Sequence, residues 1–170
     1  MAGYIGTQAV SVNTTSATIS DDLAVGDDAS VAGDLSVTGD YSSTTAGTSN
    51  LRLGVNAGNS IASGGNYNVC VGDEAGTAIT TGDYNVALGY EALKNEDAHG
   101  LNTAIGTQAL FSLNAGADAY NVAVGYQAGA AVSTGLRNTL VGGLAGDALN
   151  TSNDNVAIGY AALTTETSGG

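Results

Sequence analysis

The chain has 170 residues and a formal net charge of −13, with 16 acidic residues against three Lys and Arg. A field of that sign repels phosphate backbones, so we expect no nucleic-acid partner. No apolar run approaches the roughly 20 residues that a membrane-spanning helix needs, and a single Cys excludes an intrachain disulfide framework and a cysteine-rich metal site.

The first 49 residues divide into three predicted segments. Residues 1–21 are predicted to attach the chain to a partner, and YIGTQAV at residues 4–10 echoes AIGTQAL at residues 104–110. Residues 22–40 repeat with a period of six (DLAVGD, DASVAG, DLSVTG), and alternating apolar residues closed by Gly or Asp predict very short strands. Strands this short cannot bury an apolar face alone, so we expect an intertwined β stalk. Residues 41–49 are a polar linker.

The hexads also repeat an acid, which raises the question of calcium. Carboxylates suit that hard cation, but the glycine–aspartate nonapeptides of calcium-binding β-rolls are missing. We therefore favour solvated turn acids, and calcium between chains stays an open alternative. The acids are Asp22, Asp28, Asp34 and Asp40.

Residues 50–170 contain seven copies of a motif of the type NVAVGYQAG, each beginning with Asn. The starts lie 18, 17, 17, 19, 17 and 17 residues apart, and a period of that size is typical of a solenoid. We predict an all-β, parallel β-solenoid with coils of about 17 residues. The start column is Asn50, Asn68, Asn85, Asn102, Asn121, Asn138 and Asn155. The Gly column is Gly54, Gly72, Gly89, Gly106, Gly125, Gly142 and Gly159.

Each column has a predicted structural role. The Gly column indicates a corner that needs positive φ or close backbone approach. The Asn side chains are expected to form a ladder along the stack, at the roughly 4.8 Å spacing of paired strands. The residues one and three places after each Asn, such as Val86 and Leu88, are predicted to fill the coil interior, because side chains alternate along a strand.

The residue between these two positions is small or apolar in six of seven copies, the exception being Arg52. A solvated strand position normally carries Thr, Lys or Ser, so this second face is also expected to be buried. A coil has one interior, and we predict that identical chains cover the second face in a homotrimer. The predicted subunit interface is Cys70, Ala87, Ala104, Ala123, Leu140 and Ala157.

No catalytic, metal or cofactor constellation is recognisable in the sequence. Glu74 and Glu91 occupy one column and stack one coil apart, near the separation of a retaining glycosidase pair. Nothing around them predicts the burial that would split their pKa values, so we favour an outward polar ladder. His99 is predicted to be a solvated loop residue without a partner at metal-ligand spacing. We therefore expect a non-enzymatic protein without cofactors.

Tyrosines are the best surface candidates. Six of the eight lie in two columns, either directly before a start Asn or directly after a Gly of the corner column. Two interpretations stay open: packing at a corner or subunit contact, and exposed rings that stack on sugars. The column before Asn contains Tyr67, Tyr84 and Tyr120, and the column of candidate surface contacts contains Tyr90, Tyr126 and Tyr160.

The NVAVGYQAG-type units resemble the head repeats of trimeric autotransporter adhesins, which implies a left-handed parallel β-roll in a trimer. Over its whole length the chain is similar to bacteriophage tail-fibre and virion-fibre proteins, with Leu-x-Val-x-Gly-Asp hexads followed by NTAIGTQAL-type arrays. This resemblance implies a virion fibre or spike that binds other virion proteins through its N-terminal segment. The turns at residues 94–100, 111–119 and 143–152 would display contacts to a host glycan or receptor. The alternatives are a capsid-decorating or filament-forming protein and a fragment of an adhesin on a bacterial surface.

Overall fold

A computed structural model describes residues 46–165 of the chain. All of these residues belong to one compact unit of the chain, Gly39–Gly170. The predicted attachment segment, the hexad stalk and most of the linker therefore lie outside the described residues. Within residues 46–165, no helix is long and apolar enough to cross a membrane.

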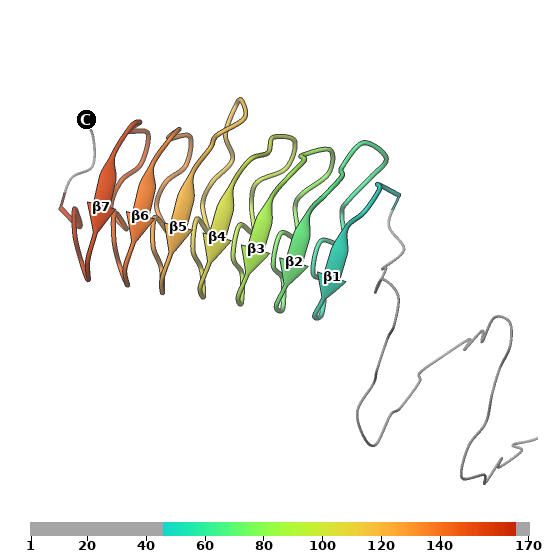
Figure 1. The fold of residues 1–170 in the computed structure, drawn as a ribbon, viewed down its shortest axis with the longest axis horizontal. Helices are drawn as coiled ribbons and strands as arrows, with labels where there is room; N and C mark the ends of the chain where they lie inside the picture. The colour runs from blue at the N-terminus through green and yellow to red at the C-terminus, as the bar shows by residue number, and fades with distance from the viewer. Residues whose placement is uncertain (1–45, 166–170) are drawn as a thin grey trace, which may run out of the picture. The chain divides into compact units, whose positions relative to one another are not determined.

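The described residues form a parallel β-solenoid, which confirms the predicted fold class (Figure 1). Consecutive strands pair in parallel and in order, so each coil adds one strand to a single seven-stranded sheet. The register places equal repeat positions side by side, as in Cys70 with Ala87 and Ala87 with Ala104. The strands are β1 (Leu51–Leu53), β2 (Val69–Val71), β3 (Val86–Leu88), β4 (Thr103–Ile105), β5 (Val122–Val124), β6 (Thr139–Val141) and β7 (Val156–Ile158).

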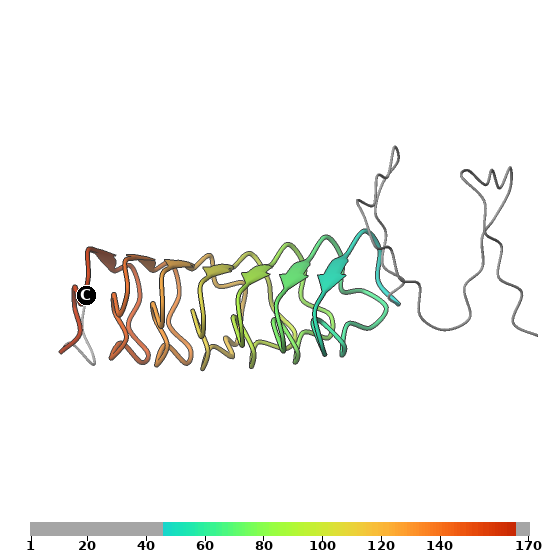
Figure 2. The same ribbon diagram turned by 90° about the horizontal axis from the view of Figure 1, so that it is seen from below.

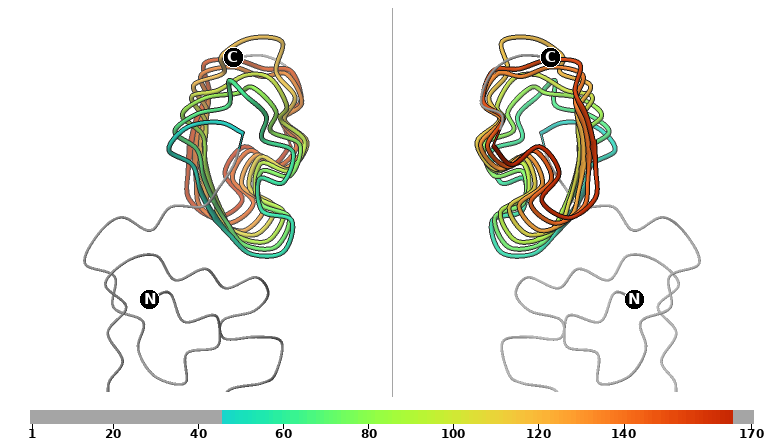
Figure 3. Two further views of the ribbon diagram at one scale, coloured as in Figure 1. Left: turned by 90° about the vertical axis from the view of Figure 1, so that its right-hand side faces the viewer. Right: turned by 90° about the vertical axis from the view of Figure 1, so that its left-hand side faces the viewer.

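Hydrogen bonds between neighbouring coils continue well beyond the strands. Past the corner, the Gly76 N–H donates to the Ala92 carbonyl at 2.9 Å, and further round the coil the Thr80 N–H donates to the Asp97 carbonyl at 2.6 Å. The coils therefore superpose closely when the solenoid is viewed along its axis (Figure 3). These inter-coil hydrogen bonds satisfy backbone N–H and C=O groups of the turns that would otherwise have to bond to water.

The two faces of the strands are the reverse of our prediction. The middle residues of the strands point into the coil, and Ala87 and Ala104 are fully buried within one chain. The flanking residues point outwards, and in β7 Val156 and Ile158 are 67% and 71% exposed. The interior behind the strands also contains a column of alanines, and its middle-residue position accepts side chains as large as Leu140. The sheet forms one wall of the solenoid, and the turns lie away from it (Figure 2).

The start Asn residues are buried and form a ladder, although its pairing differs from simple amide stacking. Each Asn side-chain carbonyl from Asn50 to Asn138 accepts the backbone N–H of the next start Asn, at 2.8–3.2 Å. The amide nitrogens donate mainly to backbone carbonyls, such as Gly135 O from Asn121 Nδ2 at 2.8 Å. Amide-to-amide bonds join Asn102 to Asn85, Asn138 to Asn121, and Asn155 to Asn138.

Every coil contains residues with positive φ, and several of them are not glycine. The Gly corner column has φ between 125° and 139°, in a region that L residues rarely adopt. The residue before each start Asn has φ of 52–64°, and it is a Tyr, Leu, Arg, Ser or Asp. Residues six places after each Asn, including Glu74 and Leu144, are left-handed as well. The inter-coil hydrogen bonds hold these conformations, which isolated residues of these types disfavour.

Candidate functional site

The outward side chains of the seven strands make one continuous apolar strip, which we call the outer face. Twelve of its fourteen residues are aliphatic, two are Thr and none is charged. Leu53, Leu88 and Val122 are 56%, 42% and 36% exposed, so the aliphatic surface is open in the single chain. The outer face comprises Leu51, Leu53, Val69, Val71, Val86, Leu88, Thr103, Ile105, Val122, Val124, Thr139, Val141, Val156 and Ile158.

An exposed face of this kind is unusual for a parallel sheet. Parallel sheets are normally covered on both faces, and large exposed apolar patches mark interaction sites. The absence of charge on the outer face contrasts with the net charge of −13 over the chain. The outer face therefore suits a second apolar surface.

The column predicted to form the subunit interface lies inside the coil instead. Cys70, Ala87, Ala104, Ala123 and Leu140 are fully buried in the single chain, and Ala157 in the last described coil is 2% exposed. These residues are already covered by the rest of their own coil, so no partner can reach them. Arg52, at the same position in the first copy, donates from Nε to the Ala57 carbonyl.

Cys70 is expected to be inert in the folded chain. Its thiol is fully buried, and desolvation raises the pKa of Cys70 to about 11 although the Arg52 charge opposes the shift. The thiolate is the reactive form, so only about one thiol in a thousand would be ionised at pH 8 even with free access. We predict no reaction with a chromogenic disulfide reagent in buffer and stoichiometric labelling in guanidinium chloride. Rapid labelling of the native chain would contradict this burial.

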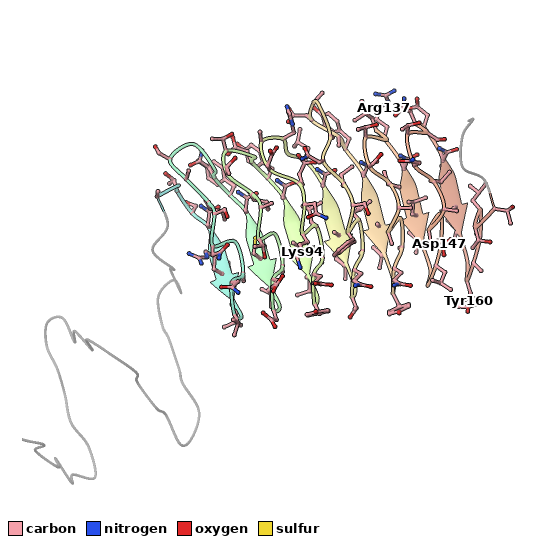
Figure 4. The ribbon with its side chains drawn as sticks, turned by 180° about the vertical axis from the view of Figure 1, so that it is seen from behind. Lys94, Arg137, Asp147 and Tyr160 are labelled. Carbon is pink, nitrogen blue, oxygen red and sulfur yellow. The ribbon has the colours of Figure 1, made fainter. Side chains whose placement is uncertain are left out.

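The two tyrosine columns occupy different edges of the solenoid and reach solvent in the single chain. Arg137, which shares the column before Asn, and Tyr160, which follows a corner Gly, lie at opposite edges of the stack (Figure 4). Tyr67 and Tyr84 stack on one another with ring centroids 5.0 Å apart and an interplanar angle of 10°. The other tyrosines of these columns, including Tyr90 and Tyr126, are also exposed. Contact of these tyrosines with a partner or a ligand therefore stays a prediction.

Glu74 and Glu91 form an ion-pair cluster with one lysine between them. Lys94 Nζ lies 2.5 Å from Glu74 Oε2 and 2.7 Å from Glu91 Oε1, and Gln108 donates to Glu91 Oε2 at 2.8 Å. Hydrogen bonds from Lys94 and then Gln108 lower the pKa of Glu91 below its usual range. A glycosidase acid needs the opposite shift, because it must be protonated near neutral pH. Gln127 donates to Gln108 in turn, so the column is a polar ladder, but Glu91 is buried and does not face outwards as predicted.

The turn at residues 94–100 departs from the sequence prediction. His99 was expected to be a solvated residue without a partner, but its Nδ1 atom lies 3.8 Å from Glu96 Oε1. Glu96, the acid beside the imidazole ring, is fully buried. Asp97 completes a group whose ligand-type atoms lie within 4.8 Å of one another. Sequence spacing alone did not identify this cluster, since three neighbouring residues of a turn can point in any direction.

Comparisons of the chain with protein-family models, curated proteins and solved structures found no match.

Proposed function

We propose that the chain is a non-enzymatic structural module that self-associates through its outer face. The observation that carries this proposal is the uncharged aliphatic strip along all seven strands. Burial of apolar surface stabilises association by roughly 25 cal/mol per Å², and this strip offers a row of Val, Leu and Ile side chains for it. Function in this sense is assembly of a stiff rod that holds its turns at fixed positions.

Identical chains are the best partners for the outer face. The strip repeats with the coil period, so parallel copies in register would set every strand beside the equivalent strand of a neighbour. Mutual repulsion between chains of net charge −13 disfavours contacts elsewhere, whereas the outer face carries no charge. Three copies around an axis would cover all outer faces at once, and the resemblance to trimeric adhesin heads favours this number.

The biological setting that we propose is a phage virion, in which the module is part of a tail or capsid fibre. The likeness of the hexads and the NTAIGTQAL-type array to virion fibres supports this setting. Residues 1–21 would then bind other virion proteins. The turns at residues 94–100, 111–119 and 143–152, together with the exposed tyrosines, would face a host glycan or receptor.

Sedimentation equilibrium of the full chain tests the self-association. We expect a mass about three times the 16.5 kDa of one chain. The double variant Leu88→Asp, Val122→Asp places two carboxylates in each apolar interface, so it should sediment as a monomer with an unchanged circular dichroism spectrum. A dimer would keep the outer face as an interface and overturn the trimer.

The control is Tyr120→Asp, which adds one acidic side chain at an exposed aromatic position outside the outer face. Tyr120 already has φ of 52°, a conformation that Asp tolerates better than Tyr. This variant should remain associated. A wild-type mass of one chain at micromolar concentration would overturn the proposed function.

A further inference from the structure

One buried position of the repeat changes its chemistry in the third copy. Eleven places after the start Asn, five copies carry a buried aliphatic residue that packs into the core, and the seventh has Glu166, which lies outside the described residues. The third copy has Glu96 at this position, and its side chain is fully buried. The aliphatic members of this column are Ile61, Ile79, Leu113, Val132 and Leu149.

A carboxylate in place of a buried aliphatic side chain is unfavourable unless the carboxylate has hydrogen-bond or charge partners. Glu96 Oε2 accepts the Ala115 N–H at 2.9 Å, from the enlarged turn of the next coil, and Oε1 accepts the His99 N–H at 3.3 Å. A carboxylate can accept about four hydrogen bonds, so these two contacts leave part of its capacity unused. The nearby Lys94 does not neutralise it in this structure, because its ammonium group lies between Glu74 and Glu91.

The unused capacity lies near an imidazole nitrogen that has no hydrogen-bond partner within the described residues. His99 Nδ1 is buried and makes no hydrogen bond within the described residues, although the side chain as a whole is 33% exposed. Buried nitrogen atoms of side chains normally have a hydrogen-bond partner or a metal. Asp97 adds a second carboxylate, so one nitrogen and two oxygens converge on one point of the turn.

We propose that Glu96, Asp97 and His99 bind a divalent transition-metal cation of the Zn²⁺ class. An imidazole with two carboxylates suits Zn²⁺ and its neighbours better than calcium, which prefers oxygen alone. The ligand atoms lie within 4.8 Å of one another, and small side-chain rotations would bring them to the roughly 3.3 Å that separates ligands in a tetrahedral zinc site. The exposed side of His99 leaves room for water to complete the coordination.

The site is independent of the outer face, because it lies in a turn and needs one chain only. Its effect would be to hold residues 94–100 against the enlarged turn of the next coil, since Glu96 already contacts Ala115. Two states without a metal fit the same atoms. In one, a proton is shared between Glu96 and His99; in the other, the Glu96 carboxylate is held by the two backbone N–H groups alone. These are the competing outcomes of the test.

Calorimetric titration of ZnCl₂ into the full chain, stripped of metal with a chelator, tests the proposal. We expect one Zn²⁺ per chain with micromolar affinity. His99→Ala and Glu96→Gln should each weaken binding by about 100-fold or more, because each removes a ligand atom. Glu96→Gln can still accept the Ala115 N–H, and His99 is partly exposed, so both variants should keep the wild-type circular dichroism spectrum.

The matched control is Asp73→Asn, which removes an exposed carboxylate outside the cluster and should leave zinc binding unchanged. A second readout uses His99 as the single histidine of the chain. Zinc at this site should shift the His99 imidazole resonances in an NMR spectrum. Binding that is equal in wild type and His99→Ala, or absent in the wild type, would overturn the metal site.

Discussion

Replacing Gly106 with Ala is expected to destabilise the solenoid by about 3 kcal/mol or more. Gly106 has φ of +128°, and an added Cβ would lie 2.4 Å from the Gly125 carbonyl oxygen of the next coil. The atom that it meets is backbone, so no flexible side chain can move aside. The substitution therefore combines left-handed strain with a steric conflict between coils, and denaturant unfolding followed by circular dichroism would measure the loss.

Two other glycines separate these two causes. Gly159 has nearly the same φ, +125°, but no described atom lies within 4 Å of its added Cβ, so Gly159→Ala should show the strain alone, about 1–3 kcal/mol. Gly116 has neither a positive φ nor a neighbour within 4 Å, so Gly116→Ala should be neutral or slightly stabilising. Equal losses for Gly106→Ala and Gly159→Ala would mean that neighbouring coils move apart to accept a methyl group.

The coil period and the strand positions could be predicted from the sequence because they depend on local, repeated signals. A start Asn, three alternating residues and a Gly recur at nearly constant spacing, and strands such as Val86–Leu88 fall where this pattern places them. The corner role of Gly follows from the same reasoning, since only Gly combines positive φ with close backbone approach.

The direction of the strand faces could not be predicted in the same way. Alternation separates two sets of side chains, but it does not state which set is inside when both are apolar. The deciding contacts come from the rest of the coil, where the turns supply the other buried residues behind the strand. They bury Ala87 and Leu140 and leave Leu88 exposed, and these contacts are not visible in a nine-residue motif.

The left-handed turns and the acidic cluster were missed for different reasons. Tyr84 and Leu101 adopt positive φ because inter-coil hydrogen bonds require it, and their residue types have no preference that signals it. Glu96 did have a signal, because it interrupts a column that is Ile, Leu or Val in five of the seven copies. Aligning positions beyond the first nine residues of each copy would have found it.

Replacing Asn121 with Ala is expected to cost about 2–5 kcal/mol, because it leaves two buried backbone groups without partners. Asn121 Oδ1 accepts the Asn138 N–H at 2.9 Å, and its Nδ2 donates to the Gly135 carbonyl at 2.8 Å. The first bond reaches the next coil, the second reaches the end of the same coil, and both are buried. The exposed Asn59 makes two weak side-chain contacts, both at 3.4 Å, so Asn59→Ala should change stability by less than about 0.5 kcal/mol.

Asn121→Asp separates the acceptor role of this side chain from its donor role. The aspartate can still accept the Asn138 N–H, but its second oxygen would face the Gly135 carbonyl as a buried charge. We expect this variant to be at least as unstable as Asn121→Ala at pH 7. Burial raises the pKa of such a carboxyl, so stability should return as the pH falls and the protonated group donates to Gly135. Wild-type stability of Asn121→Asp at pH 7 would show that acceptance alone maintains the ladder.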